Sequence, residues 1–166
     1  MEIKKGDNHS KIIGNFGENL VCDFLSRSGF EVALIDHTGI DIIAYNKETN
    51  KRLGITVKSR TREVGTEETH VSILKGADRK KVSDACSDFN WDPWIAVYIE
   101  TEKYADLYLI SLHDYDEKYG GGRTQKSVNW YMGRKAKERY ENDPNVKYIH
   151  VEFIERNWNW QEESLF

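Results

Sequence analysis

Two short runs of strand-forming residues constrain this chain more than any other feature. They read GIDIIA at 39–44 and ITVKSR at 55–60, and a polar segment at 47–51 lies between them. β-Branched residues and alternation on both sides of a polar turn are typical of a β-hairpin. Because successive strand residues point to opposite faces, such a hairpin separates an apolar face from a polar one.

The polar face of the predicted hairpin carries an aspartate and a lysine. If the turn is centred between Thr49 and Asn50, Asp41 lies opposite Lys58 and the side chain of Thr56 points to the same side. This arrangement depends on the pairing register, because a slip of one residue would exchange the two faces.

The segments around the hairpin predict an α/β fold. Apolar residues at helical spacing predict a helix over 11–28, and alternating strand formers predict a strand over 30–35. With the hairpin strands at 41–46 and 52–59, the order becomes one helix followed by three strands. A short strand, a helix, a nearly continuous apolar strand and its hairpin partner are expected next, at 71–74, 77–89, 93–100 and 105–112. This order predicts a mixed central sheet flanked by helices.

The C-terminal third is expected to elaborate one domain. The 166 residues suit a single domain, 1–166, with a core at about 11–112 and a helix and strand elaboration at 113–166. Within the elaboration, the pattern predicts a loop at 114–125, a helix at 127–140 and a strand at 146–155. The tail to Phe166 carries two tryptophans.

Composition excludes several classes of protein. The 24 Lys and Arg against 28 Asp and Glu give a net charge of −4, which argues against a general nucleic-acid coat protein but allows a local basic groove. The two cysteines lie far apart, so a zinc site is not expected. No apolar run approaches the length of a membrane span, and the N-terminus has no apolar signal sequence. A cytoplasmic protein without a membrane partner is therefore expected.

A metal site is expected where the first helix meets the hairpin. Glu18 has mostly apolar neighbours at helical spacing, so a helix packed on the hairpin would bring it close to Asp41. Two carboxylates repel each other, and a bound cation such as Mg²⁺ or Mn²⁺ relieves that cost. Lys58 would position the attacking water or stabilise charge on phosphorus. Ser59, Arg60 and Arg62 follow directly and could bind the phosphates of DNA.

These residues resemble the PD-(D/E)XK nuclease superfamily, and within it the archaeal Holliday-junction resolvases and related restriction-endonuclease-like proteins. The resemblance spans about residues 11–62 and is carried by Gly17-Glu18, Leu20-Val21, Leu25, GFEV at 29–32, GIDIIA at 39–44 and ITVK at 55–58. It implies an α-β-β-β-α-β core and a Mg²⁺-dependent endonuclease acting on branched or foreign DNA. In that family, a helix glutamate and the hairpin aspartate hold the metal and the lysine is catalytic; Glu18, Asp41 and Lys58 match them. It also implies a homodimer.

The sequence departs from the family pattern at Thr56. This residue occupies the position of the third metal ligand, an acid in the D/E-X-K motif. A neutral hydroxyl is a weaker ligand than a carboxylate, so metal affinity should fall unless another acid, such as Glu63, supplies the charge. The alternatives are a catalytically inactive nuclease-fold protein that binds nucleic acid or a protein partner, and a plain α/β partner-binding domain.

Two basic runs lie outside the motif. Arg79-Lys80-Lys81 and the basic residues between Arg123 and Arg139 could flank a DNA groove, although such runs are usually solvated helix faces. Trp130 and Tyr131 lie beside the second run and could stack on bases, with core packing as the favoured interpretation.

Overall fold

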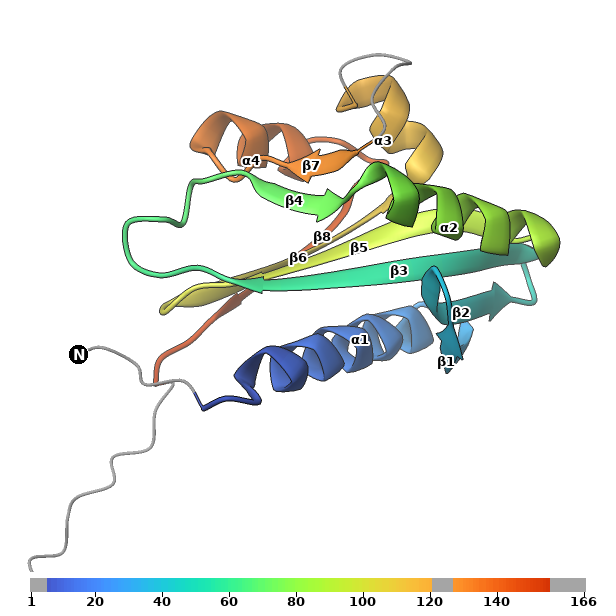
Figure 1. Cartoon of the computed structure of the whole chain (residues 1–166), viewed down its shortest axis with the longest axis horizontal. Helices are drawn as coiled ribbons and strands as arrows, with labels where there is room; N and C mark the ends of the chain where they lie inside the picture. The colour runs from blue at the N-terminus through green and yellow to red at the C-terminus, as the bar shows by residue number, and fades with distance from the viewer. Residues whose placement is uncertain (1–5, 121–126, 156–166) are drawn as a thin grey trace, which may run out of the picture.

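A six-stranded mixed sheet forms the centre of the protein. The computed structural model describes residues 6–120 and 127–155 (Figure 1). The elements are α1 (His9–Arg27), β1 (Glu31–His37), β2 (Ile40–Asn46), β3 (Lys51–Thr61), β4 (Val71–Leu74), α2 (Gly76–Asp88), β5 (Asp92–Glu100), β6 (Tyr104–Ser111), α3 (Leu112–Lys118), β7 (Val128–Trp130), α4 (Arg134–Glu141) and β8 (Lys147–Glu152). The strand order in the central sheet is β1-β2-β3-β5-β6-β8, while β4 and β7 form a separate pair.

The parallel contact between β3 and β5 makes the sheet mixed. All other neighbouring strands are antiparallel. Parallel neighbours need a crossover connection, and β4 followed by α2 supplies it. Up to β6, the elements follow the predicted order of helix, three strands, short strand, helix and two further strands, and the predicted strand at 71–74 is β4.

Two hydrophobic cores lie on the two faces of the sheet. On one face, α1 packs against apolar residues of the hairpin, including Ile42, Ala44 and Ile55. On the other, α2 and the β4–β7 pair cover residues such as Ile95 and Val97 of β5. Figure 1 shows α1 beneath the sheet and α2 above it. None of the helices in residues 6–120 and 127–155 has the length and apolarity that a bilayer crossing requires.

The hairpin register differs from the predicted one by two residues. Asn46 pairs with Lys51 and Ile42 with Ile55, which centres the turn one residue earlier than expected. Asp41 therefore lies opposite Thr56, and the predicted pairing of Asp41 with Lys58 is wrong. A shift of two residues preserves the alternation, so all three side chains still share one face.

The C-terminal elements differ from the prediction in two places. The segment predicted as a helix at 127–140 contains strand β7 and only then helix α4, because the buried Trp130 pairs with β4 instead of continuing a helix. The predicted loop at 114–125 begins within α3, whose start is capped by the Ser111 hydroxyl accepting from the Asp114 backbone N–H. The remainder of that loop, 121–126, and the tail after Glu155 lie outside the described residues.

Candidate metal and nucleic-acid site

The Asp41 side chain is held at the start of β2. Its Oδ2 accepts a hydrogen bond of 2.7 Å from the Val57 backbone N–H and one of 3.1 Å from the Thr56 hydroxyl. Within the described part of the chain, Oδ1 accepts no hydrogen bond. Asp41 is half-buried, so its carboxylate is fixed in place with one oxygen available to a ligand.

Thr56 lies at the centre of this arrangement and is only 2% exposed. Its hydroxyl donates to Asp41, so it supports the position of that carboxylate. The position that carries an acid in the D/E-X-K pattern is therefore neutral here and already engaged. This interaction explains how a threonine is accommodated at a buried position beside a carboxylate.

Glu18 approaches the same site from α1. Burial raises the pKa of the Glu18 carboxyl, the nearby charge of Asp41 raises it further, and Lys58 opposes the effect. These three groups, from α1, β2 and β3, are therefore close enough to interact electrostatically. Gly17 explains the close approach of the helix, because a Cβ at that position would lie 2.3 Å from the Ser59 hydroxyl oxygen. Gly17 belongs to the sequence run that carries the family resemblance, and this close contact gives a physical reason for a glycine at that position.

Lys58 continues the polar face of β3 two residues beyond Thr56. It is half-buried and lies next to Val97 of β5. Among the described residues, its ammonium group makes no hydrogen bond or ion pair. A lysine without such a partner, close to Asp41 and Glu18, is available to a phosphate group.

The three residues predicted to bind phosphates separate onto two faces. The Ser59 hydroxyl is buried beneath α1, next to Gly17. By strand alternation, Arg60 lies on the Lys58 face, and Arg62 follows β3 directly. Burial lowers the pKa of Arg62, and the neighbouring charge of Arg60 lowers it further, which indicates that these two cations are close together.

The donor set is compatible with a magnesium-like ion. Within the described residues, no group of three or more His, Cys, Asp and Glu side chains could hold a metal ion, so Glu63 does not complete a cluster with Glu18 and Asp41. Mg²⁺, however, is commonly bound by one or two carboxylates, several waters and substrate phosphates. The repulsion that raises the Glu18 pKa would be relieved by such a cation, which supports the fit.

The basic residue runs are largely neutralised by neighbouring carboxylates. In α2, Arg79 pairs with Asp116, and Lys80 and Lys81 each pair with an aspartate of their own helix. In α4, Arg134 pairs with Glu138 of the same helix. These pairs favour the interpretation as solvated helix faces. Arg123 and Lys126 lie outside the described residues.

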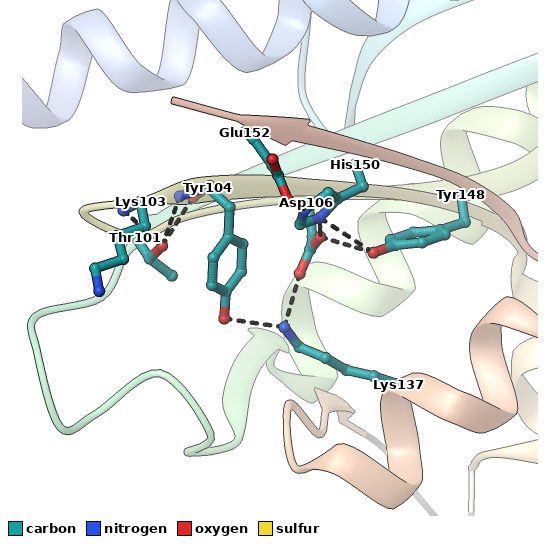
Figure 2. A network of polar contacts seen from close by, with 8 residues as sticks. All are labelled: Thr101, Lys103, Tyr104, Asp106, Lys137, Tyr148, His150 and Glu152. Atoms are coloured by element: carbon teal, nitrogen blue, oxygen red, sulfur yellow. Dashed lines mark hydrogen bonds and ion pairs between the residues drawn. The ribbon is translucent and has the colours of Figure 1, made fainter. Parts of the chain in front are cut away.

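A second polar cluster lies away from the hairpin, between β6, β8 and α4. Figure 2 shows Asp106 at its centre, fully buried and surrounded by Lys137, Tyr148 and His150. The Asp106 carboxylate lies 2.9 Å from Lys137 Nζ, 2.9 Å from the Tyr148 hydroxyl and 2.7 Å from His150 Nδ1. Lys137 also bonds to Tyr104. This lysine of the second basic run therefore anchors α4 to the sheet instead of facing a DNA groove.

Together, these elements define the restriction-endonuclease-like fold: a mixed sheet, helices on both faces and a hairpin that carries the acid and the lysine. No protein-family model matches the sequence, and a search of curated proteins also gives no match.

Among solved structures, the chain is similar to Hjc, a Holliday junction resolvase from the archaeal hyperthermophile Archaeoglobus fulgidus. The match covers 74% of this chain and 85% of that one, with a TM-score of 0.52 and 17% sequence identity. The resemblance to the resolvases is thus confirmed for the fold.

Proposed function

We propose that the chain is a metal-dependent endonuclease that cleaves phosphodiester bonds in branched DNA. The main supporting observation is that Glu18, Asp41 and Lys58, from three different elements, interact electrostatically in one half-buried site. A carboxyl whose pKa is raised by burial and by a specific neighbouring charge, as for Glu18, is typical of a functional site. The resolvase-like fold adds support for DNA as the substrate, since the similar protein is a Holliday junction resolvase.

In this proposal, Glu18 and Asp41 hold Mg²⁺ or Mn²⁺, and Thr56 supports the site through its bond to Asp41. The bound ion would polarise a phosphoryl oxygen and lower the pKa of a water molecule. Asp41 keeps Oδ2 engaged with the Val57 N–H, so its carboxylate does not need to reorganise when a ligand arrives. The residues thus supply a preorganised pair of negative charges.

Lys58 has the catalytic role in the proposal. Its ammonium group would orient the attacking water or stabilise the negative charge that develops on the phosphorus oxygens. Arg60 and Arg62 lie further along the same strand direction and would bind the flanking phosphates. Such phosphate contacts make binding strongly salt-dependent.

Thr56 favours a second candidate function, a nuclease-fold protein that binds DNA without cutting it. With two carboxylates instead of three, the site holds less negative charge, and the Thr56 hydroxyl is already donated to Asp41. Folds persist when sites lose activity, so the same cationic strand could serve binding alone.

Cleavage assays with matched variants separate the two functions. The wild-type protein, Asp41→Asn and Lys58→Met are incubated with a four-way junction and a linear duplex, with Mg²⁺ or Mn²⁺. We expect junction cleavage by the wild type and its loss in both variants. Lys47→Met is the control, because Lys47 is an exposed residue in the hairpin turn, away from the site. Cleavage that survives both site substitutions would exclude the proposed site.

A binding measurement completes the test. Salt-sensitive binding without cleavage would support the second function, and Thr56→Glu should then raise the affinity for Mn²⁺ in calorimetry, because a carboxylate replaces a neutral hydroxyl. An unchanged affinity in this variant would contradict the explanation through Thr56.

We also propose that the protein acts in the cytoplasm as a homodimer, on the resemblance to resolvases. A junction has two related strands to cut, and a twofold dimer presents two equivalent sites to them. Light scattering on the purified protein, with and without junction DNA, would measure the mass; a monomer in both samples would contradict this proposal.

A further inference from the structure

An exposed pair of rings lies just beyond the cationic end of β3. The rings of His70 and Tyr131 have centroids 5.9 Å apart and are tilted by 37°. Both side chains are exposed, and 54% of Tyr131 is accessible to solvent. Exposed aromatic rings of this kind leave their faces available for stacking on a flat ligand.

The small β4–β7 sheet fixes the position of the pair. Val71 pairs with Trp130, so His70 and Tyr131 are the next residues outward on the two strands. Trp130 is completely buried and anchors β7, whereas the Tyr131 side chain points to solvent. The Tyr131 backbone N–H also donates to the Tyr140 hydroxyl, at 3.3 Å. The backbone that carries the Tyr131 ring is therefore held in place by this hydrogen bond and by the adjacent strand pair.

Arg62 connects this pair to the proposed active site. Its Nη2 donates to the His70 carbonyl at 3.3 Å, and its own backbone N–H donates to the Glu100 carbonyl at the end of β5. Within the described residues, the Arg62 Nε has no hydrogen-bond partner although it is buried. The guanidinium thus links the end of β3 to the backbone of the residue that carries one of the two rings, with its Nη1 donating to the Thr61 carbonyl at 3.4 Å.

The cations form a row that leads to the lysine. Lys58, Arg60 and Arg62 are every second residue of an extended segment, so they share a face at intervals of roughly 6–7 Å. The loop from β3 to β4 projects beyond the end of β3 (Figure 1). His70 directly precedes β4 and Tyr131 directly follows β7, so the ring pair lies at the end of this loop. Such an arrangement suits a nucleic-acid strand, because the positive charges can bind successive phosphates and the exposed rings can stack on a base.

We propose that His70 and Tyr131 form a platform that stacks on a base left unstacked at a DNA branch, while Arg60 and Arg62 bind the phosphates between that base and Lys58. This inference rests on the proposed function and specifies its substrate class: DNA that offers a base outside the helical stack. In a continuous duplex both faces of each base are covered by neighbouring base pairs, so the platform would gain nothing from it. Stacking on an aromatic ring tolerates any base, so it selects structure and not sequence.

Binding to two DNA substrates tests the platform. The affinities of the full chain for a four-way junction and for a duplex of the same sequence are measured without divalent metal ions, so that cleavage does not interfere. 2-Aminopurine at the branch reports stacking through its fluorescence. The variants are Tyr131→Ala and His70→Ala, which remove a ring, and Tyr131→Phe, which retains it.

Phe89→Ala is the matched control. Phe89 is also 54% exposed and also contacts a histidine, His37, with ring centroids 5.5 Å apart, but it follows α2 at a different place in the fold. Its removal should leave both affinities unchanged. The comparison therefore separates an effect of the platform from the general effect of losing an exposed aromatic side chain.

We expect Tyr131→Ala to lower the affinity for the junction about tenfold and to leave the affinity for the duplex unchanged. Tyr131→Phe should bind like the wild type, and the fluorescence change should disappear only when a ring is removed. Equal losses on both substrates, or no loss on either in Tyr131→Ala and His70→Ala, would overturn the platform and leave the nuclease proposal intact. Failure of the wild type to bind either DNA would overturn both.

Discussion

The close contact between Gly17 of α1 and Ser59 of β3 positions Glu18, and it leads to a testable prediction about stability. A Cβ added at Gly17 would lie 2.3 Å from the Ser59 hydroxyl oxygen and 3.3 Å from the Tyr98 Cβ. Gly17→Ala should therefore overpack this contact, at a cost of about 1–3 kcal/mol. Alanine in a helix interior returns about 0.5–1 kcal/mol relative to glycine. The net expected loss of stability is about 1 kcal/mol.

Ser59→Ala should reverse this loss. The Ser59 hydroxyl is buried and has no hydrogen-bond partner within the described residues, so its removal should be neutral or stabilising by about 1 kcal/mol. In the double variant, the nearest remaining atoms would be the Tyr98 and residue 59 Cβ atoms, at 3.3 and 3.5 Å from the new Cβ. The double variant should then be at least as stable as the wild type, with a coupling of about 1–3 kcal/mol between the two positions.

Urea unfolding of the four proteins measures this coupling. A change of about 1 kcal/mol moves the midpoint by roughly 0.5 M at the slopes typical of small proteins. Gly14→Ala is the control: it lies in the same helix with no atom within 4 Å of the added Cβ, so it should only stabilise. If Gly17→Ala loses the same stability with and without the Ser59 hydroxyl, the close contact does not exist as described and Glu18 is positioned by other means.

Three further predictions concern charge and backbone. Burial and the charge of Asp41 raise the pKa of Glu18 above its ordinary value of 4.5, so a fraction of the molecules keeps this carboxyl protonated just above pH 4.5. Because a protonated carboxyl is a poor metal ligand, metal affinity should decrease as the pH is lowered through this range. Calorimetry should find a weaker pH dependence in Glu18→Gln. Burial lowers the pKa of Lys137, but hydrogen bonds, chiefly to Asp106, outweigh it and raise the pKa above 10.5. The ion pair thus stabilises the fold below that pH and is lost as pH rises through the raised value; Lys137→Met should cost about 3 kcal/mol at neutral pH and less in strongly alkaline urea titrations. Gly39→Ala should lower the thermal midpoint, since φ is +108° and its Cβ would lie 2.6 Å from the Lys81 carbonyl oxygen, for a cost of about 2 kcal/mol or more.

The faces of the hairpin could be predicted from sequence, but its register could not. Alternation assigns each residue to a face, whereas pairing depends on the turn. Here the Asn46 side chain accepts from the backbone N–H groups of Glu48 and Thr49, and Asn50 adopts a left-handed φ of 56°. These local bonds set a turn of four residues between Asn46 and Lys51. A count of residues between two apolar runs does not contain this information.

The C-terminal elements were harder to predict because tertiary packing decides them. Residues 127–140 read as one helix, yet Trp130 stacks on Tyr140 with ring centroids 4.2 Å apart and lies next to Tyr108, at 5.1 Å. Burying this aromatic cluster favours a strand paired with β4 over an exposed helical turn. Tyr131 was a candidate for base stacking because it lies beside the second basic run. Its pairing with His70, however, is a consequence of the contact between β4 and β7 and could not be predicted from spacing.

The corrected register changes the meaning of Thr56. With Asp41 opposite Lys58, the threonine would have been a neighbour of the site; with Asp41 opposite Thr56, it is the residue that holds the aspartate. Lys58 lies two residues further along β3, beside the cations that lead to the ring pair, and makes no hydrogen bond or ion pair among the described residues. Since two carboxylates leave much of a metal ion's coordination to water and phosphate, metal and DNA should each strengthen the binding of the other by the same factor. In the proposed function, such a site depends on its substrate to become complete, so we expect activity only where a branch presents both phosphates and an unstacked base.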